Sequence, residues 1–251
     1  MASHLLEHQL VTITGIGGVG KTRLAVQVGR ELLPQFPGGV WFTPLALSTT
    51  RSEILSNLAS VLDVQLLPGD EPIISIANQL DDKKRLLILD NFEHLLDSSD
   101  VVSTLIELTT NLTVLVTSRQ QLQLTEEAVF PIAGLSYNPV EVPGDSKTDD
   151  DACKLFIDVA RRARLDFDPT FNSNYIVRIA NIVKGHPLAL VLAASWVDGL
   201  SCREIAEELQ HGLDILETES GDLPDRQRSV RATFNYSWTL LDNQELSLIH
   251  I

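Results

Sequence analysis

The chain has 251 residues, with 34 acidic against 19 basic side chains, which give a formal net charge of −15 at pH 7. A chain of that charge has no general attraction for the phosphates of nucleic acids or for anionic lipid, so we expect no direct binding to either. Hydrophobic residues make up 44% of the chain, which is enough for a packed core. The length allows one large domain or two modest ones.

Cysteine usage and hydropathy indicate the compartment. Cys153 and Cys202 lie far apart and lack metal-ligand spacing, so we expect reduced, buried thiols. The first ten residues show no basic segment followed by an apolar stretch, so no secretory signal is expected. The longest uncharged apolar run, 187–197, is too short to cross a bilayer. These features predict a soluble cytoplasmic protein that has no membrane partner.

The most informative segment is 10–22, LVTITGIGGVGKT. It has the pattern G-x-x-x-x-G-K-[ST] between an apolar strand and a helical pattern, which is typical of a phosphate-binding P-loop. Glycines let backbone N–H groups turn towards phosphate oxygens, and the helix N-terminus favours negative charge. We expect Lys21 at the β- and γ-phosphates and the Thr22 hydroxyl on Mg²⁺. The expected nucleotide contacts in this segment are Gly15, Gly17, Gly18, Val19, Gly20, Lys21, Thr22 and Arg23.

The same glycines also fit G-x-G-x-x-G, the dinucleotide fingerprint. That motif needs an acid about 20 residues later, at the end of the second strand. The expected second strand, 39–47, contains no acid, and Glu31 falls on the helix before it. The Lys-Thr pair likewise favours a nucleoside triphosphate.

Strands and helices alternate up to residue 132, which is typical of a doubly wound α/β domain. We predict strands at 10–13, 39–47, 85–90, 112–116 and 128–132, and helices at 21–33, 54–62, 73–81 and 101–108. Later helices are predicted at 152–163, 174–183, 188–197, 201–209 and 229–241. Helix starts are supported by two capping boxes, Thr50 with Glu53 and Ser201 with Glu204. The predicted domains are 1–135 (α/β), 136–151 (linker), 152–216 (helical) and 217–251 (a further domain that begins there).

Asp90 is the candidate acid on the Mg²⁺ side of the phosphate site. It ends the apolar strand RLLILD, which would place its carboxylate at the edge of the sheet beside the phosphates. The alternative is that Asp90 caps the following helix. Many hydrolases of this kind have a second acid at the next position, but Asn91 stands there.

The group that would activate water is less well defined. Glu93, expected in the first turn of the next helix, could polarise water or could simply favour the helix N-terminus. His94 is expected on the helix surface. Arg119 closes the next buried strand, where its guanidinium could bind the γ-phosphate or could be a solvated loop arginine.

The order LVTITGIGGVGKTRLA, LLILDNFEHLL, VLVTSR and KGHPLAL resembles the NB-ARC branch of the STAND signal-transduction ATPases. The likeness is greatest to bacterial regulators that couple such a module to DNA-binding and helical-repeat regions. SVRATFNYSWTLLD is similar to the start of the winged-helix domain of the family, in which this chain would be truncated. The resemblance covers about residues 10–241 and implies an ASCE-type P-loop sheet in the order 5-1-4-3-2.

The resemblance also implies roles. Arg119 would sense the γ-phosphate, and Pro187 would pack near adenine. ATP or ADP, with Mg²⁺, would control domain closure and assembly with itself or with other proteins, and slow hydrolysis would reset the state. The chain departs from the family pattern because it has no upstream hhGR segment, and His250 stands in no matching context.

Two other functions compete with a switch ATPase. One is a nucleotide-binding scaffold without turnover, which Asn91 and the absent end segments favour. The other is a P-loop kinase of a small molecule, which needs an acceptor pocket and usually an arginine-rich lid, whereas the region after residue 132 is an acidic linker and an apolar bundle.

Overall fold

The computed structural model describes residues 1–66, 69, 71–80, 82–139 and 148–211. They form two compact units. The first unit consists of the described residues of Met1–Gly15 and Lys21–Ile132, and the second combines Ile16–Gly20 with the described residues from Ala133 onward. Each unit is described by itself.

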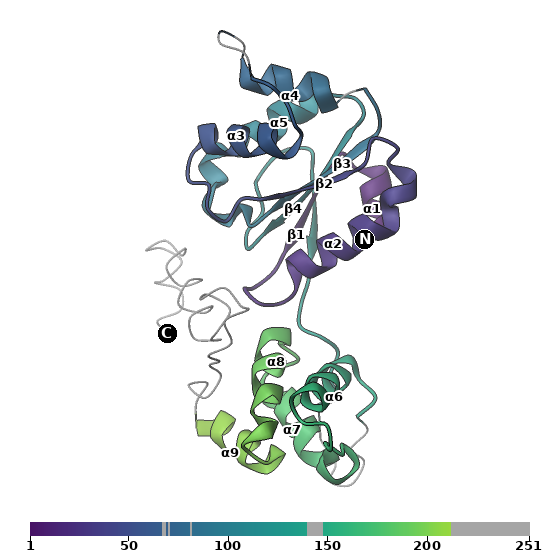
Figure 1. The fold of residues 1–251 in the computed structure, drawn as a ribbon, viewed down its shortest axis with the longest axis vertical. Coiled ribbons are helices and arrows are strands. Elements are labelled where there is room, and N and C mark those ends of the chain that lie inside the picture. Colours follow the sequence, from purple (N-terminus) through teal and green to yellow (C-terminus); the bar gives the residue numbers. More distant parts are fainter. Residues whose placement is uncertain (67–68, 70, 81, 140–147, 212–251) are drawn as a thin grey trace. The chain divides into compact units, whose positions relative to one another are not determined.

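The first unit is built on a five-stranded parallel sheet (Figure 1). The strands are β1 (Leu10–Thr14), β2 (Val40–Pro44), β3 (Arg85–Asp90), β4 (Leu112–Ser118) and β5 (Glu127–Pro131). Their order, β2-β3-β4-β1-β5, is the predicted order counted from the opposite edge, so the predicted fold class is confirmed. β3 and β4 are buried at every position, which explains why both are continuous apolar runs.

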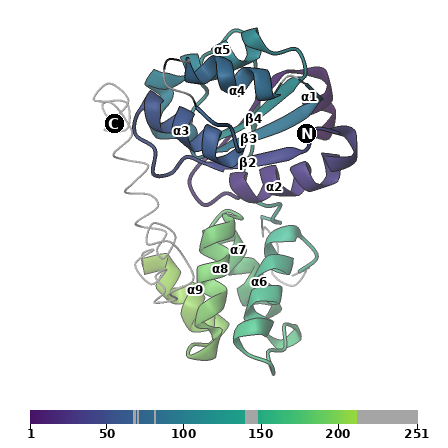
Figure 2. The same cartoon turned by 45° about the horizontal axis from the view of Figure 1, so that its top comes forward.

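Helices cover both faces of this sheet (Figure 2). They are α1 (Ala2–Glu7), α2 (Lys21–Leu32), α3 (Arg51–Val61), α4 (Pro72–Leu80) and α5 (Asp100–Leu108). Successive residues of a strand point to opposite faces. On β3, Leu86 and Ile88 therefore pack into the core with α1 and α2, whereas Leu87 and Leu89 pack into the core with α3, α4 and α5.

The segment that follows β3 differs from the prediction. Instead of entering an α-helix, the chain makes two 3₁₀ turns, η2 (Phe92–His94) and η3 (Leu96–Ser98), before α5 begins. The cause is the left-handed backbone at Asn91, with φ 68° and ψ 50°, which turns the chain sharply as it leaves the sheet. Glu93 therefore lies in a 3₁₀ turn, not in the first turn of a helix.

The second unit contains the predicted helices up to residue 211. These are α6 (Asp151–Ala163), α7 (Ser173–Ile182), α8 (Pro187–Ser195) and α9 (Cys202–His211), around a core of their own. At the start of α9, the Ser201 N–H donates to Glu204 Oε2 at 2.8 Å and the Glu204 N–H donates to Ser201 Oγ at 3.3 Å, so this capping box is confirmed. Both cysteines are buried free thiols, as predicted.

Other predictions concern segments outside this description. The predicted helix 229–241 and the beginning of a winged-helix domain fall beyond the described residues. The domain boundaries at 135, 151 and 216 stay predictions. None of the helices described is both long and apolar enough to span a membrane.

Candidate functional site

Three neighbouring strands of the first unit end at one edge of the sheet. β1 pairs in parallel with β4, so that Thr14 lies opposite Ser118, and β4 pairs in parallel with β3. The residues that follow these strands therefore leave the sheet at the same edge. This register is what brings the start of the P-loop, the end of β3 and Arg119 into one neighbourhood.

Asp90 contacts the P-loop threonine directly. The Thr22 hydroxyl donates to Asp90 Oδ1 at 2.6 Å, although 68 positions separate the two residues. The Thr117 hydroxyl donates to the same carboxylate oxygen at 2.6 Å. The position of Asp90 is therefore that of an acid facing the P-loop, not that of a helix cap: the next turn begins with Asn91 as its N-cap residue.

Thr22 and Asp90 are chemically suited to hold Mg²⁺. Both offer hard oxygen ligands, which this ion prefers, and Asp90 is buried. The two oxygens lie 2.6 Å apart, joined by the hydrogen bond from Thr22, so this pair would supply two ligands to a divalent cation.

Lys21 lies buried at the start of α2. Its Nζ donates to the carbonyl oxygen of Gly15, at the opposite end of the P-loop, at 2.8 Å. Burial lowers the pKa of this ammonium; Glu93 acts against that shift, Arg119 adds to it, and Asp90 also acts against it. Two cations, Lys21 and Arg119, therefore interact with two carboxylates, Glu93 and Asp90, and the formal charges of the four groups sum to zero.

Arg119 and Glu93 form a buried ion pair within this neighbourhood. Arg119 Nε lies 3.1 Å from Glu93 Oε1, with side chains only 13% and 4% exposed. Arg119 is therefore not a solvated loop arginine. Glu93 reaches the site because the chain turns at Asn91, whose backbone N–H donates to the Thr117 hydroxyl at 3.0 Å.

His94 holds two loops together. Its Nε2 lies 2.7 Å from the carbonyl oxygen of Ser48, and its Nδ1 lies 3.3 Å from the side-chain amide of Asn91. A carbonyl oxygen can only accept, so Nε2 carries the proton and Nδ1 accepts from the amide. The expected helix-surface position is wrong: His94 is half-buried, and both ring nitrogens have partners.

The remaining P-loop residues, Ile16–Gly20, group with the second unit. In that unit, the His186 Nε2–H donates to the Gly17 carbonyl oxygen at 2.8 Å, and the Leu188 N–H donates to that of Gly18 at 3.3 Å. Gly18 has φ +76°, and a Cβ there would lie 2.8 Å from Leu188 Cβ, so the position requires glycine. Pro187 occupies the first position of α8, after the N-cap His186.

Two further predicted contacts were Val19 and Arg23. Val19 is buried, which leaves its backbone as the part able to face a phosphate. Arg23 is exposed on α2.

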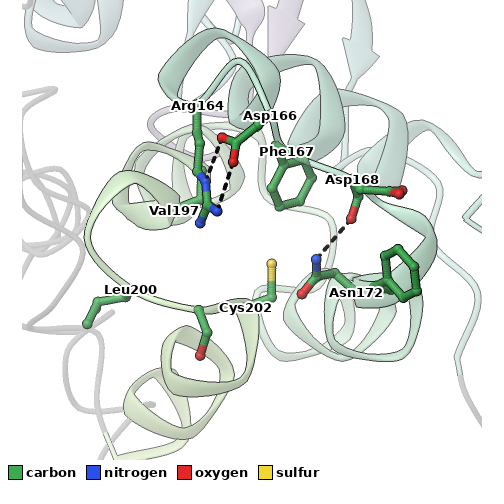
Figure 3. Close-up of a pocket in the computed structure, with 10 residues that line it drawn as sticks. Arg164, Asp166, Phe167, Asp168, Asn172, Val197, Leu200 and Cys202 are labelled. Carbon is green, nitrogen blue, oxygen red and sulfur yellow. Dashed lines mark hydrogen bonds and ion pairs between the residues drawn. The ribbon is translucent and has the colours of Figure 1, made fainter.

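The second unit also has a hollow of about 240 Å³, lined in part by Arg164, Asp166 and Cys202 (Figure 3). Arg164 Nε pairs with Asp166 Oδ1 at 2.9 Å, so the cation beside the hollow already has a carboxylate partner. Burial raises the pKa of the Cys202 thiol to about 11, which keeps it neutral and a poor nucleophile. The predicted site residues are not among those that line this hollow.

A parallel sheet with a lysine and a threonine from a Gly-rich loop facing an acid across the strand edge defines a P-loop nucleotide-binding domain. Residues 5–125 match the family model described as an AAA domain. Over these residues the first unit is similar to AAA domains, and its parallel sheet and Gly-rich loop have the P-loop fold.

Relatives with similar sequences occur in mycobacteria. An uncharacterised protein of Mycobacterium tuberculosis is 32% identical over 250 residues, which cover 98% of this chain and 60% of that protein. A second protein of this organism, provisionally named an HTH-type transcriptional regulator, is 30% identical over 247 residues, which cover 98% of this chain and 26% of that protein. The chain therefore spans 60% of the length of the first relative and 26% of the second.

One structural neighbour extends the likeness of fold. A chain from the structure of Drosophila ORC bound to DNA matches with a TM-score of 0.55 and 20% identity, over 86% of this chain and 65% of that chain. At this identity the match shows a shared fold only. The narrower NB-ARC and STAND assignment stays a prediction, as do the roles of individual site residues.

Proposed function

We propose that the first unit binds ATP or ADP with Mg²⁺ and hydrolyses ATP slowly. The observation that carries the proposal is the hydrogen bond between Thr22 and Asp90 at 2.6 Å, because it joins the P-loop to the acid at the end of β3. The positive charge of Lys21 interacts with the carboxylate of Asp90. In this proposal its ammonium binds the β- and γ-phosphates. Mg²⁺, held by Thr22 and Asp90, would neutralise phosphate charge.

We further propose that the nucleotide state acts as a switch, as in the NB-ARC-like modules that the motifs resemble. In this proposal ATP and ADP favour different arrangements of the chain and so control assembly with itself or with protein partners. Arg119 would distinguish the two by its contact with the γ-phosphate, and Pro187 would pack near the base. The mycobacterial relative named as a transcriptional regulator supports a role in regulated transcription.

Nucleic acid is not part of this proposal. The Drosophila structure is of ORC bound to DNA, but the likeness supports only the fold. The net charge of −15 disfavours direct contact of this chain with phosphates.

The proposal is tested by titrating the purified chain with ATP or ADP in the presence of Mg²⁺, by calorimetry, after any co-purifying nucleotide has been identified by mass. Lys21→Ala removes a charged donor to phosphate and should weaken binding by about 10- to 100-fold. The matched control is Lys83→Ala, which removes an exposed lysine of the same unit and should bind as the unchanged chain does.

Three results would count against it. Absence of binding to both nucleotides at millimolar concentration would refute nucleotide binding itself. Rapid ADP production that requires a small-molecule acceptor would indicate a kinase. Binding without any hydrolysis, including in a version extended at both ends, would favour the scaffold that Asn91, in place of a second acid, also suggests.

A further inference from the structure

Helix α1 carries a cluster of two histidines and one glutamate on its solvent-exposed side. His4, Glu7 and His8 each place one potential ligand atom within 4.8 Å of those of the other two, and all three residues are exposed. Among the residues that the structure describes, no other three histidines, cysteines or acids bring their ligand atoms this close together. The cluster lies in the first unit and includes none of the P-loop residues.

The spacing of the three residues places them together. Positions i, i+3 and i+4 lie on one side of a helix, so residues 4, 7 and 8 share one side of α1. Leu5, on the other side, is buried in the core that α1 shares with β1 and α2. The His8 N–H donates to the His4 carbonyl oxygen at 2.9 Å, so a backbone hydrogen bond joins the two histidines. The cluster is therefore held by an anchored helix.

The two imidazole rings lie side by side. Their centroids are 6.1 Å apart and their planes differ by 23°. The His4 ring also makes an edge contact with Phe130 of β5, with centroids 5.6 Å apart. In a tetrahedral zinc site the ligand atoms lie about 3.4 Å from one another. Atoms within 4.8 Å must therefore approach by at most about 1.4 Å, which exposed side chains can do by rotating about their own bonds.

We propose that His4, Glu7 and His8 bind one Zn²⁺ ion. Two imidazole nitrogens and one carboxylate oxygen form a ligand set that zinc accepts, with a water molecule in the fourth position. Mg²⁺ and Ca²⁺ prefer oxygen ligands, so they should compete poorly for this cluster. The carboxyl end of a helix and the net charge of −15 both favour a cation there. The inference does not depend on the proposed nucleotide binding.

The ion would stabilise the start of the first unit. α1 has only six residues, of which Leu5 alone is buried, and so short a helix is not stable by itself. His8 ends the helix with an extended backbone, and β1 begins two residues later, at Leu10. Zinc bound by both histidines would bridge the last turn of α1. We therefore expect the metal to reduce opening of this helix next to β1.

The test is calorimetric titration of the purified, untagged chain with ZnCl₂ in the presence of millimolar MgCl₂. Mg²⁺ occupies sites made of oxygen ligands, such as Thr22 with Asp90, without competing for imidazole. One Zn²⁺ should bind per chain at micromolar metal. His8→Ala should weaken binding by about 100-fold or more, because loss of a group that merely orients a ligand already costs about 10- to 100-fold. The substituted side chain is exposed, and thermal unfolding establishes that the variant is folded.

A second pair of variants tests the carboxylate. Glu7→Gln keeps the shape of the side chain but removes its charge, so it should weaken zinc binding by about tenfold or more. The matched control is Glu31→Gln, which changes an exposed acid of α2 in the same unit and should bind zinc as the unchanged chain does. In NMR spectra, zinc should shift the ring signals of His4 and His8 and leave those of His94 in place.

Hydrogen exchange of the His8 amide tests the stabilising role. At a free zinc concentration ten times the dissociation constant, exchange through opening of α1 should slow by about tenfold, provided that the open helix does not bind the metal. The same concentration should leave this rate unchanged in His8→Ala, measured at the neighbouring amides of α1.

Three results would overturn the inference. Binding of zinc only at millimolar concentration would show that the cluster is not a metal site. Micromolar binding that persists in both His8→Ala and Glu7→Gln would place the ion elsewhere in the chain. Binding that these variants abolish, with no change in amide exchange of α1, would confirm the site and refute its stabilising role.

Discussion

Asn91 shows how much one backbone conformation contributes to the site. Its left-handed dihedral angles turn the chain after β3, and its side-chain amide lies 3.3 Å from the Nδ1 atom of His94. Asparagine tolerates this conformation better than most residues because its short polar side chain can hydrogen-bond locally. The residue therefore does more than replace a second acid: it sets where Glu93 lies.

Replacement of Asn91 by alanine should destabilise the chain by about 1–2 kcal/mol, because alanine has no local hydrogen bond to offset a left-handed backbone. Asn91→Gly should cost less, since glycine adopts the conformation without steric penalty. Urea unfolding followed by circular dichroism measures both. An alanine variant as stable as the unchanged chain would show that the turn is not strained.

The sequence predicts some residues of the site better than others. Lys21, Thr22 and Asp90 were expected together because a P-loop motif and a strand-ending acid each define a position on the sheet edge. The pairing of Glu93 with Arg119 was not expected, because it depends on the sign of φ at residue 91 and on a 3₁₀ turn, and neither leaves a pattern in hydrophobic spacing.

At the scale of elements, the hydrophobic pattern predicts the ends of a strand or helix best where every residue of that element is buried. β3 was predicted with its observed ends, 85–90, because every residue between an arginine and an aspartate faces the core. Helix α1 was missed because it has only six residues and only Leu5 is buried. β4 continues to Ser118, two residues beyond the prediction, because Thr117 and Ser118 are buried polar residues.

Helix α6 carries a prediction about alkaline pH. Its N-cap Asp150 accepts from the Cys153 N–H at 2.8 Å. Burial, together with the hydrogen bond and charge of Asp150, raises the pKa of the Cys153 thiol from 9.0 to about 12. Below pH 9 both the folded and the unfolded chain keep this proton, so the contribution of the thiol to the free energy of unfolding is fully present and does not depend on pH. As the pH rises from 9 towards 12 only the unfolded chain loses the proton, so stability falls.

The free energy of unfolding should therefore fall less steeply between pH 9 and pH 11 in Cys153→Ala than in the unchanged chain. The difference in slope should correspond to the loss of one proton on unfolding. Urea unfolding at a series of pH values measures the slope. The variant is expected to be less stable at pH 7, because a buried side chain is shortened, so the slope and not the absolute stability is the test. Parallel curves for the two proteins would contradict the assigned pKa.

At the scale of the whole molecule, the excess of acidic residues predicts how the chain behaves with DNA. Non-specific binding depends on lysine and arginine replacing the counterions of phosphates. With a net charge of −15, the chain should show no saturable binding to a random duplex at micromolar protein in about 150 mM salt. Fluorescence anisotropy of a labelled duplex measures this, with and without ATP. Saturable binding would contradict this prediction and would show that the chain binds DNA despite its negative charge.

The order of strands in the sheet has a consequence for synthesis of the protein. β1 is the first strand made, yet its two neighbours, β4 and β5, begin at Leu112 and Glu127. About 100 residues must follow β1 before its first partner exists, which takes on the order of 5–20 s at about 5–20 residues per second. During that time the strand leading into the P-loop has both edges unpaired on the ribosome. The strand that leads into the Gly-rich loop therefore joins a paired sheet only after most of the sheet has been synthesised.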